Sequence, residues 1–376
     1  MTDLDLLLAD VRALVECESP SSDLDAVARS AEVVAGIGTA RLGVEPERIV
    51  LDGRTHLRWR AEGPAAVLLL GHHDTVWPLG SLVAMPCTVE DGVLRGPGCF
   101  DMKAGLVMAF HAAAGLKGVT ILVTGDEELG SPSSRVLIED EARRVSAALV
   151  LEAAGHGGAL KTERKGVSLY DVRVTGRAAH AGLEPERGVN ATVELAHQAL
   201  AIAALADPAA GTTVTPTVLQ AGTTTNTVPG AGSLAVDVRA RTLAEQQRVD
   251  HAMRALRPAL SGSVVEVLGG PNRPPLEATS SAVLFARAAA VAVREGLPAL
   301  TGASVGGASD GNLTAGVGTP TLDGLGAVGG GAHAAHEHVV VDELPRRTAL
   351  LRALLEELLE PVPSTNSPLA AGAGRP

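Results

Sequence analysis

The stretch VLLLGHHDTVW, residues Val67–Trp77, decides the fold of this chain. Its aliphatic residues end at Gly71 and predict a buried strand of a parallel sheet. The polar residues that follow should lie at the carboxyl end of that strand, where open α/β sheets bind ligands. In extended backbone, His72 and Asp74 point to one side and His73 to the other. His72 with Asp74 is therefore a candidate metal-binding pair, although a polar turn after a strand has the same composition.

A second candidate ligand, Asp101, follows a rigid glycine-proline turn at residues 96–98. We expect it to open a helix over 101–115, where its carboxylate could hold a metal or only cap the helix. Cys99 lies nearby but has no second cysteine close in sequence. We interpret it as a small buried hydrophobic residue and not as a zinc ligand.

Two more predicted strands end in carboxylates. The strand 119–123 runs into Asp126, Glu127 and Glu128, and the strand 147–151 ends at Glu152. Consecutive carboxylates repel one another unless a cation lies among them. Neighbouring side chains diverge in extended backbone, so one glutamate could bind metal while the other faces a water. The alternative is a solvated acidic turn that caps a helix from residue 131.

A glycine-rich stretch near the C-terminus, GGGAHAAHEH at residues 329–338, presents a histidine cluster. The preceding Gly324-x-Gly326-x-x-Gly329 matches a dinucleotide-binding pattern. Its glycines, however, lead into histidines instead of opening a helix followed by an acidic residue. A loop that presents His333 is the better account, with a polar surface turn as the alternative.

Composition bounds the class of protein. The chain has 376 residues, more than the roughly 250–300 that usually form a domain with a single hydrophobic core, so two domains are expected. A net charge of −12 argues against nucleic acid or an anionic membrane as partner. No apolar run approaches the ~20 residues of a membrane span, and the N-terminus lacks the features of a signal peptide. Three irregularly spaced cysteines fit a reducing compartment, so we expect a cytoplasmic protein.

The remaining patterns predict the order of elements. Near the N-terminus we expect helices over 3–16 and 23–37 and an edge strand over 56–60, followed by a hairpin that turns at 90–92. The middle of the chain reads β-α-β-β-α-β, which is a ferredoxin-like unit. Its expected elements are 166–175, 190–206, 214–221, 232–241, 243–260 and 264–269. Helices over 282–295 and 342–360 should close the chain.

Together these motifs resemble the acetylornithine deacetylase, succinyl-diaminopimelate desuccinylase and glutamate carboxypeptidase superfamily of dinuclear zinc hydrolases, the glutamate carboxypeptidase type most of all. The resemblance spans about residues 5–360. It implies an α/β catalytic domain with a mixed, largely parallel sheet and an inserted ferredoxin-like lid and dimerisation domain. The implied division is a catalytic domain at 1–160 and 276–361, a lid at 161–275 and a disordered tail at 362–376.

The resemblance also implies roles for the motif residues. Two Zn²⁺ ions would bind per subunit, with Co²⁺ or Mn²⁺ able to substitute. Asp101 would bridge both ions, His72 and Glu152 would complete one site, and Glu128 and His333 the other. Asp74 would orient His72, and Glu127 would be the general base. His336 remains a minor alternative to His333.

Substrate-binding residues follow in the same way. His180 would reach the partner subunit's active site in a homodimer built through the lid and stabilise the oxygen that becomes negative. Asn226, Arg239 and the loop with Gly306 and Gly307 would hold the substrate's carboxylate. The implied activity is hydrolysis of an amide bond next to a free carboxylate, as in a carboxypeptidase or dipeptidase of the glutamate carboxypeptidase type. An N-acyl amino acid deacylase is one alternative, and a non-catalytic binding homologue is another.

Overall fold

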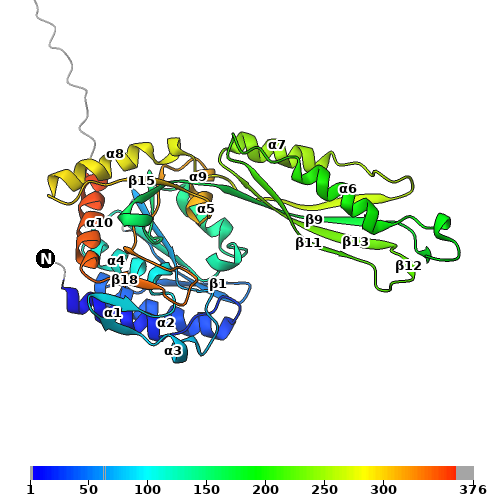
Figure 1. Cartoon of the computed structure of the whole chain (residues 1–376). Coiled ribbons are helices and arrows are strands. Elements are labelled where there is room, and N and C mark those ends of the chain that lie inside the picture. Colours follow the sequence, from blue (N-terminus) through cyan, green and yellow to red (C-terminus); the bar gives the residue numbers. More distant parts are fainter. Residues whose placement is uncertain (1–2, 62, 64, 361–376) are drawn as a thin grey trace, which may run out of the picture.

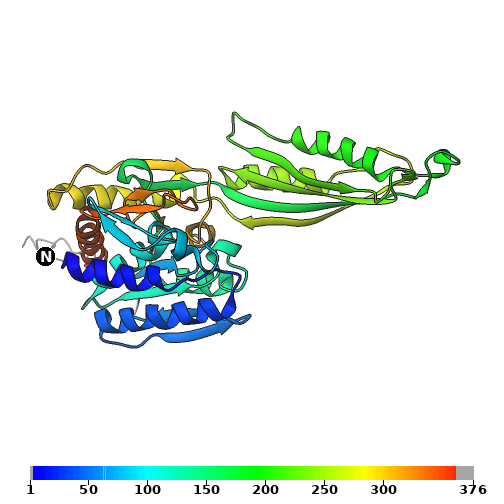
Figure 2. The same cartoon turned by 60° about the horizontal axis from the view of Figure 1, so that its bottom comes forward.

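The computed structural model describes residues 3–61, 63 and 65–360, so the predicted tail at 362–376 lies outside the described residues. Figures 1 and 2 show a rounded body from which the segment containing β9, β11 and β13 extends as a long arm. The expected metal ligands belong to the body, and the arm is the predicted lid. Within the described ranges, no helix has the length and apolarity needed to cross a bilayer.

A six-stranded mixed sheet forms the centre of the body. Its order is β1-β2-β6-β3-β7-β16, with β6, β3, β7 and β16 parallel and β2 antiparallel to both neighbours. The strands are β1 (Glu47–Leu51), β2 (Arg54–Trp59), β3 (Val67–His72), β6 (Val119–Thr124), β7 (Ala147–Val150) and β16 (Thr321–Leu322). The largely parallel core is confirmed. The prediction that residues 56–60 form an edge strand is wrong, because β1 covers that edge.

Helices cover both faces of this sheet, as the aliphatic β3 requires. Leu69 packs with residues of α1 (Leu4–Glu16), α2 (Leu24–Leu42), α4 (Ala104–Ala113), α8 (Ala278–Arg294) and α10 (Glu343–Leu359). Leu68 and Leu70 face the other way, toward α5 (Arg135–Ala142) and α9 (Gly311–Gly316). Helix α2 runs beyond its predicted end and stops at Gly43, whose φ of 75° is left-handed.

Two predicted helix starts are wrong, and both errors lie at the site. Helix α4 begins at Ala104, because Asp101 has extended dihedral angles (φ −117°, ψ 95°) within the turn η1 (Cys99–Lys103). Helix α5 begins at Arg135 and not at Ser131, which has a φ of 58°. In both places a tight turn that is not α-helical comes first and carries the carboxylates at the sheet edge.

Smaller elements surround the sheet. A second sheet has the order β17-β18-β5-β4, with strands Gly329–Gly330, His338–Val340, Val93–Arg95 and Thr88–Glu90, so the predicted hairpin at 90–92 is present. Strands β8 (Leu160–Arg164) and β15 (Gly302–Val305) form a parallel pair. The short turns are α3 (Ser81–Ala84), η2 (Glu127–Leu129), η3 (His156–Gly158) and η4 (Pro185–Arg187).

The lid has the predicted ferredoxin-like topology. Its antiparallel sheet has the order β11-β13-β9-β14, and two helices pack on one face of it. The elements are β9 (Gly166–Thr175), α6 (Ala191–Ala203), β11 (Thr213–Ala221), β13 (Ala231–Ala240), α7 (Leu243–Arg254) and β14 (Val264–Arg273). A two-stranded pair, β10 (Ala179–His180) with β12 (Thr227–Val228), lies at the end of the lid remote from the body (Figure 1).

Candidate dinuclear metal centre

The expected ligands gather at the carboxyl ends of neighbouring parallel strands. His72 is the last residue of β3, the acidic turn of Glu127 and Glu128 follows β6, and Glu152 follows β7. Asp101 comes from η1, and His333 from the glycine-rich loop between β17 and β18. This edge is where parallel α/β sheets place their ligands.

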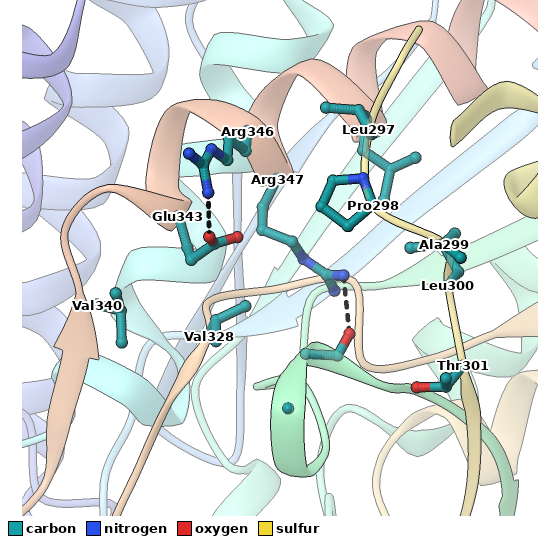
Figure 3. A pocket seen from close by; sticks show the side chains of 13 residues that line it. Leu297, Pro298, Ala299, Leu300, Thr301, Val328, Val340, Glu343, Arg346 and Arg347 are labelled. Atoms are coloured by element: carbon teal, nitrogen blue, oxygen red, sulfur yellow. Dashed lines mark hydrogen bonds and ion pairs between the residues drawn. The ribbon is translucent and has the colours of Figure 1, made fainter. Parts of the chain in front are cut away.

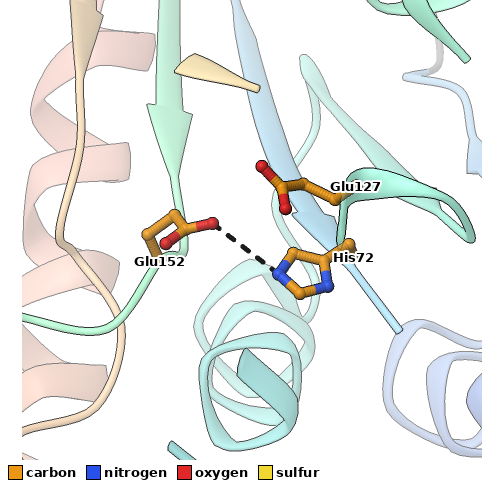
Figure 4. Close-up of side chains that lie close together, drawn as sticks. All are labelled: His72, Glu127 and Glu152. Carbon is orange, nitrogen blue, oxygen red and sulfur yellow. Dashed lines mark ion pairs between the residues drawn. The ribbon is translucent and has the colours of Figure 1, made fainter. Parts of the chain in front are cut away.

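Asp101 divides the cluster into two halves. Its Oδ1 lies 3.4 Å from His72 Nε2, and its Oδ2 lies 3.3 Å from His333 Nε2. On the first side, Glu152 Oε1 is 3.7 Å from His72 Nε2, as Figure 4 shows together with Glu127. On the second side, Glu128 Oε1 is 3.2 Å from His333 Nε2. Each half thus holds one imidazole, one glutamate and one oxygen of the shared aspartate.

The donor atoms fit divalent cations. His72 Nε2 and Asp101 Oδ1 are both buried without a hydrogen-bond partner, although they face each other. Ligand atoms of His72, Asp101 and Glu128 lie within 4.8 Å of one another, as do those of His72, Glu127 and Glu152. Imidazole nitrogens and carboxylate oxygens are the ligands that catalytic zinc sites use. The residues present therefore fit two metal ions bridged by Asp101.

The histidines hold protons tightly among these carboxylates. Burial opposes protonation of His72, but the facing carboxylates of Asp101, Asp74 and Glu152 outweigh it and raise its pKa well above 6.5. Contacts with Asp101 and Glu128 raise the pKa of His333 to about 10. A cation at these nitrogens would take the place of the protons.

Asp74 supports the site by holding the acidic turn. Its Oδ1 accepts from the N–H of Glu127 (3.2 Å), and its Oδ2 accepts from the N–H of Glu128 (3.2 Å) and from Ser21 Oγ (2.7 Å). His72 Nδ1 lies 3.5 Å from Asp74 Oδ1 but only 2.9 Å from the backbone oxygen of Asp74. Asp74 therefore positions the turn that carries Glu127 and Glu128 as well as the imidazole.

His73 points into the core, as the strand alternation predicts. Its ring lies against Ser30 Oγ (3.2 Å) and the backbone oxygen of Thr55 (3.0 Å). Burial lowers its pKa to about 4, so the ring is neutral at neutral pH.

Glu337 has a supporting role that sequence reasoning missed. Its carboxylate is 1% exposed and accepts from the backbone N–H of Gly98, Phe100 and Asp101, each at 3.0 Å. It also accepts from Trp77 Nε1 at 2.7 Å. One buried glutamate thus fixes the Asp101 turn to the loop of His333. The available signal was the position of Glu337 shortly after His333 in the same glycine-rich stretch.

The loop around His333 is constrained. His333 has a φ of 60°, which an L residue seldom adopts and which functional sites often show. Its neighbour His336 accepts a hydrogen bond from His338 Nδ1 through its backbone oxygen (2.9 Å). Among the contacts of the described residues, it is the ring of His333 that meets Asp101 and Glu128.

Two buried arginines hold the other glutamates, and neither was predicted. Arg164 donates to Glu152 Oε2 (3.0 Å) and to Asp323 Oδ2 (2.6 Å), which leaves Glu152 Oε1 toward His72. Arg273 Nη1 lies 3.0 Å from Glu127 Oε1. Arg164 and Arg273 come from β8 and from the end of β14, and only folding brings them to this edge.

These arginines also tie in the predicted substrate loop. Arg164 Nη1 donates to the backbone oxygen of Gly307 (3.0 Å), while Gly306 and Gly307 are exposed. Arg273 Nη2 donates to Asp310 Oδ1 (3.1 Å). The glycine loop therefore lies next to both ion-pair networks.

The predicted lid residues do not reach this cluster within one chain. His180 and Asn226 lie together at the β10–β12 end, where Asn226 accepts from the N–H of Ala181 through its backbone oxygen (2.9 Å). His180 is exposed, and its Nδ1 accepts from the N–H of Gly182 (3.1 Å). Arg239 lies elsewhere, opposite Val167 near the start of β9, and pairs with Asp237 at 2.8 Å. The structure thus groups His180 with Asn226 and separates both from Arg239.

Comparisons with known proteins agree with this geometry. The family model "Peptidase family M20/M25/M40" matches residues 68–357. Carboxypeptidase G2 of Pseudomonas sp. (strain RS-16) is 31% identical over 315 residues, which cover 80% of this chain and 75% of that protein. Succinyl-diaminopimelate desuccinylase of Dechloromonas aromatica is 29% identical over 348 residues, which cover 85% and 90%.

Solved structures share the fold. The aminopeptidase PepT of Bacillus cereus superimposes with a TM-score of 0.74 at 22% identity, covering 95% of this chain and 99% of that one. A metallo-carboxypeptidase of Sulfolobus solfataricus gives 0.72 at 16% identity, covering 95% and 99%. The chain is a hydrolytic enzyme that belongs to peptidase family M20/M25/M40.

Proposed function

We propose that this enzyme is a zinc-dependent hydrolase that cleaves an amide bond next to a free carboxylate, with Glu127 as general base. The observation that carries the proposal is the position of Asp101, whose two oxygens face two different histidines. Each histidine has a glutamate of its own, Glu152 for His72 and Glu128 for His333. This arrangement suits two metal ions with one bridging carboxylate.

The side chains around the centre divide the chemistry among them. Bound zinc supplies Lewis acidity at the scissile carbonyl and lowers the pKa of water toward neutrality. Glu127 takes the proton of the attacking water and passes it to the leaving amine. Burial raises the pKa of Glu127 well above 4.5 even though Arg273 opposes the shift, which suits a group that both accepts and donates a proton.

The lid would complete the site from a second subunit. His180 and Asn226 lie at the far end of the lid, away from the body of their own chain (Figure 1). In a homodimer built through the lid, His180 would reach the partner's metal centre and stabilise the negative oxygen of the tetrahedral intermediate. Arg239 and the loop of Gly306 and Gly307 would hold the substrate's carboxylate, for which the planar guanidinium is suited. We also propose that residues 161–275 form a separate lid domain, because the sheet of β11, β13, β9 and β14 has its own helices and core and extends from the body as an arm (Figure 1).

Two substrate classes stay open. Similarity to a carboxypeptidase favours a peptide with a C-terminal carboxylate. Similarity to a succinyl-diaminopimelate desuccinylase and an acetylornithine deacetylase favours an N-acyl amino acid. A non-catalytic binding homologue is disfavoured, because the ligand positions and the base are all filled.

A hydrolysis screen tests the proposal. The full-length protein, loaded in turn with Zn²⁺, Co²⁺ and Mn²⁺, is offered Glu-terminated dipeptides, N-acetyl amino acids and N-succinyl amines. We expect turnover of at least one class and its loss in the Glu127→Gln variant. Tight binding of two metal ions without turnover in any class would favour the binding homologue.

A further inference from the structure

A pocket separate from the metal centre lies beside the loops that carry Glu152 and His333. It has a volume of about 300 Å³ and lies between η3, the segment 297–301 and the first turns of α10 (Figure 3). Its walls are mainly apolar and include Leu297, Pro298, Leu300, Val328, Val340 and Leu350. None of the expected metal ligands lines it.

A buried arginine forms the polar part of this pocket. Arg347 is only 5% exposed and donates to three backbone oxygens, those of Gly326 (3.2 Å), Gly158 (3.2 Å) and Gly324 (2.5 Å). A guanidinium has five N–H donors, so this leaves donor capacity unused. In the described part of the chain, no carboxylate forms an ion pair or hydrogen bond with Arg347.

Glu343 attracts the charge of Arg347 but does not pair with it directly. Glu343 at the rim pairs with Arg346 at 2.7 Å, so two cations and one anion line the pocket. Burial lowers the pKa of Arg347 to about 10, which leaves the group charged at neutral pH. A buried charge without a directly paired counter-charge is costly, and an anion beside it would reduce that cost.

We propose that this pocket binds a small carboxylate with an apolar body, which pairs with Arg347 and acts on the metal-bearing loops from behind. The apolar walls would take the body of the ligand, and the guanidinium would take its carboxylate. The reaction class of the enzyme releases carboxylates, so a product of matching size is one natural source of such a ligand. The pocket itself is independent of the function proposed above.

The contacts of Arg347 explain how the pocket reaches the metal centre. Gly158 closes the loop that begins at Glu152, and Gly324 and Gly326 begin the segment that leads to His333. The two segments also bond directly, because Gly326 N–H donates to the backbone oxygen of Glu152 (2.9 Å). A ligand that pairs with the guanidinium would therefore change how Arg347 holds both loops.

Binding of hexanoate to the zinc-loaded, full-length enzyme tests the site by calorimetry. Ala299 is exposed and lines the pocket, so Ala299→Phe should fill it with little effect on the fold. Ala84→Phe places the same side chain at an exposed position away from the pocket and serves as the control. We expect hexanoate to bind at least about tenfold more weakly to Ala299→Phe than to the control. Equal affinities in the two variants would overturn the proposal.

A second measurement separates this pocket from the metal centre, which could also bind a carboxylate. Hexanoate should slow amide hydrogen exchange in the wall segment 297–301 and change exchange in 152–158, and Ala299→Phe should abolish both effects. Hexanamide, which has the same body without the charge, should bind at least about tenfold more weakly. Exchange effects confined to residues 99–103 and 127–129, or equal binding of hexanamide, would reject the anion site.

Discussion

The edge of the central sheet where the expected metal ligands gather, here called the metal edge, differs from the remote end of the lid in how its polar side chains are held in place. At the metal edge, each carboxylate has fixed partners, such as the three backbone N–H groups and the indole on Glu337. At the end of the lid, the exposed ring of His180 accepts from the backbone N–H groups of Gly182 and Leu183 in its own turn. The first region is organised within one chain, whereas the role that we propose for the second depends on a partner subunit.

This difference indicates what orients the side chains in each region. Electrostatic catalysis needs groups that are already oriented, and buried hydrogen bonds supply that orientation at the metal edge. A histidine on an exposed two-residue strand gains orientation only by docking. Changes at the metal edge should therefore act in any assembly state, and changes at the end of the lid should act only through a partner.

The largest effect is expected for Asp101→Ala. Removing the shared carboxylate should cost metal in both halves and reduce activity to background, because two dications would face each other with less negative charge between them. Elemental analysis of the purified variant measures this loss. Asp237→Ala, on the lid, is the control and should keep its metal. Two tightly bound ions per subunit in Asp101→Ala would exclude the bridging role.

Glu127→Gln should lower kcat and leave the metal content unchanged. Loss of a general base typically costs about 10²–10⁴ in kcat. The expected ligands stay complete in this variant, namely His72, Asp101, Glu128, Glu152 and His333. Metal content and kcat are measured on the same preparation. The matched variant Glu128→Gln should lose metal together with activity. If Glu127→Gln lost metal and Glu128→Gln kept it, the assignments of the two glutamates would be exchanged.

His180→Ala tests the contrast between the regions directly. Loss of an oxyanion donor usually costs about 10²–10³ in rate, with metal content unchanged. Mixing His180→Ala with Glu127→Gln should restore activity, because one site of each mixed dimer has both groups intact. With free exchange about half of the dimers are mixed, so roughly a quarter of wild-type activity is the ceiling. A monomer by light scattering, or no recovery after proven exchange, would contradict the cross-subunit role.

The smallest effect on activity is expected at Glu194, a buried structural carboxylate of the lid. It accepts from the N–H of Ala259 (2.9 Å) and Leu260 (2.7 Å) and from Ser263 Oγ (2.8 Å). Burial opposes the charged form, but these bonds outweigh it and lower its pKa to about 2 from 4.5. The charged group therefore stabilises the fold above pH 4.5, and that stability is lost as pH falls toward 2.

Glu194→Gln should lower the free energy of unfolding by about 2 kcal/mol at neutral pH and leave metal content unchanged. The difference from wild type should shrink between pH 4.5 and pH 2 in denaturant titrations. Glu186→Gln, at an exposed lid position, should show no such trend. A difference that stays constant with pH would mean that the charge of Glu194 contributes nothing.

Local pattern was enough to predict several parts of the molecule. The aliphatic run before His72 predicted a buried parallel strand, and alternation placed His73 in the core, where it contacts Ser30 and Thr55. The β-α-β-β-α-β order predicted the sheet of the lid. These features depend on periodicity and strand order, which a sequence displays directly.

The errors and omissions arise where distant segments compete with local preference. Asp101 looks like a helix start, yet Glu337 from the other end of the chain takes its N–H and keeps the turn non-helical. The strand at 56–60 looks like an edge until β1 pairs with it. No local signal marks Arg273 as the partner of Glu127. The two are far apart in sequence, and they meet because β14, the last strand of the lid, ends beside the acidic turn of the body.

The sequence by itself determined which residues meet at this edge of the sheet, since polar residues at successive strand ends converge when those strands lie parallel in one sheet. Only the tertiary structure decided how they are held. The buried partners of Glu127, Glu152 and Asp101 are Arg273, Arg164 and Glu337, each remote in sequence from the group that it holds. The physical reason is that a buried charge requires a partner, and the partner is whichever residue the packed chain brings within hydrogen-bonding distance.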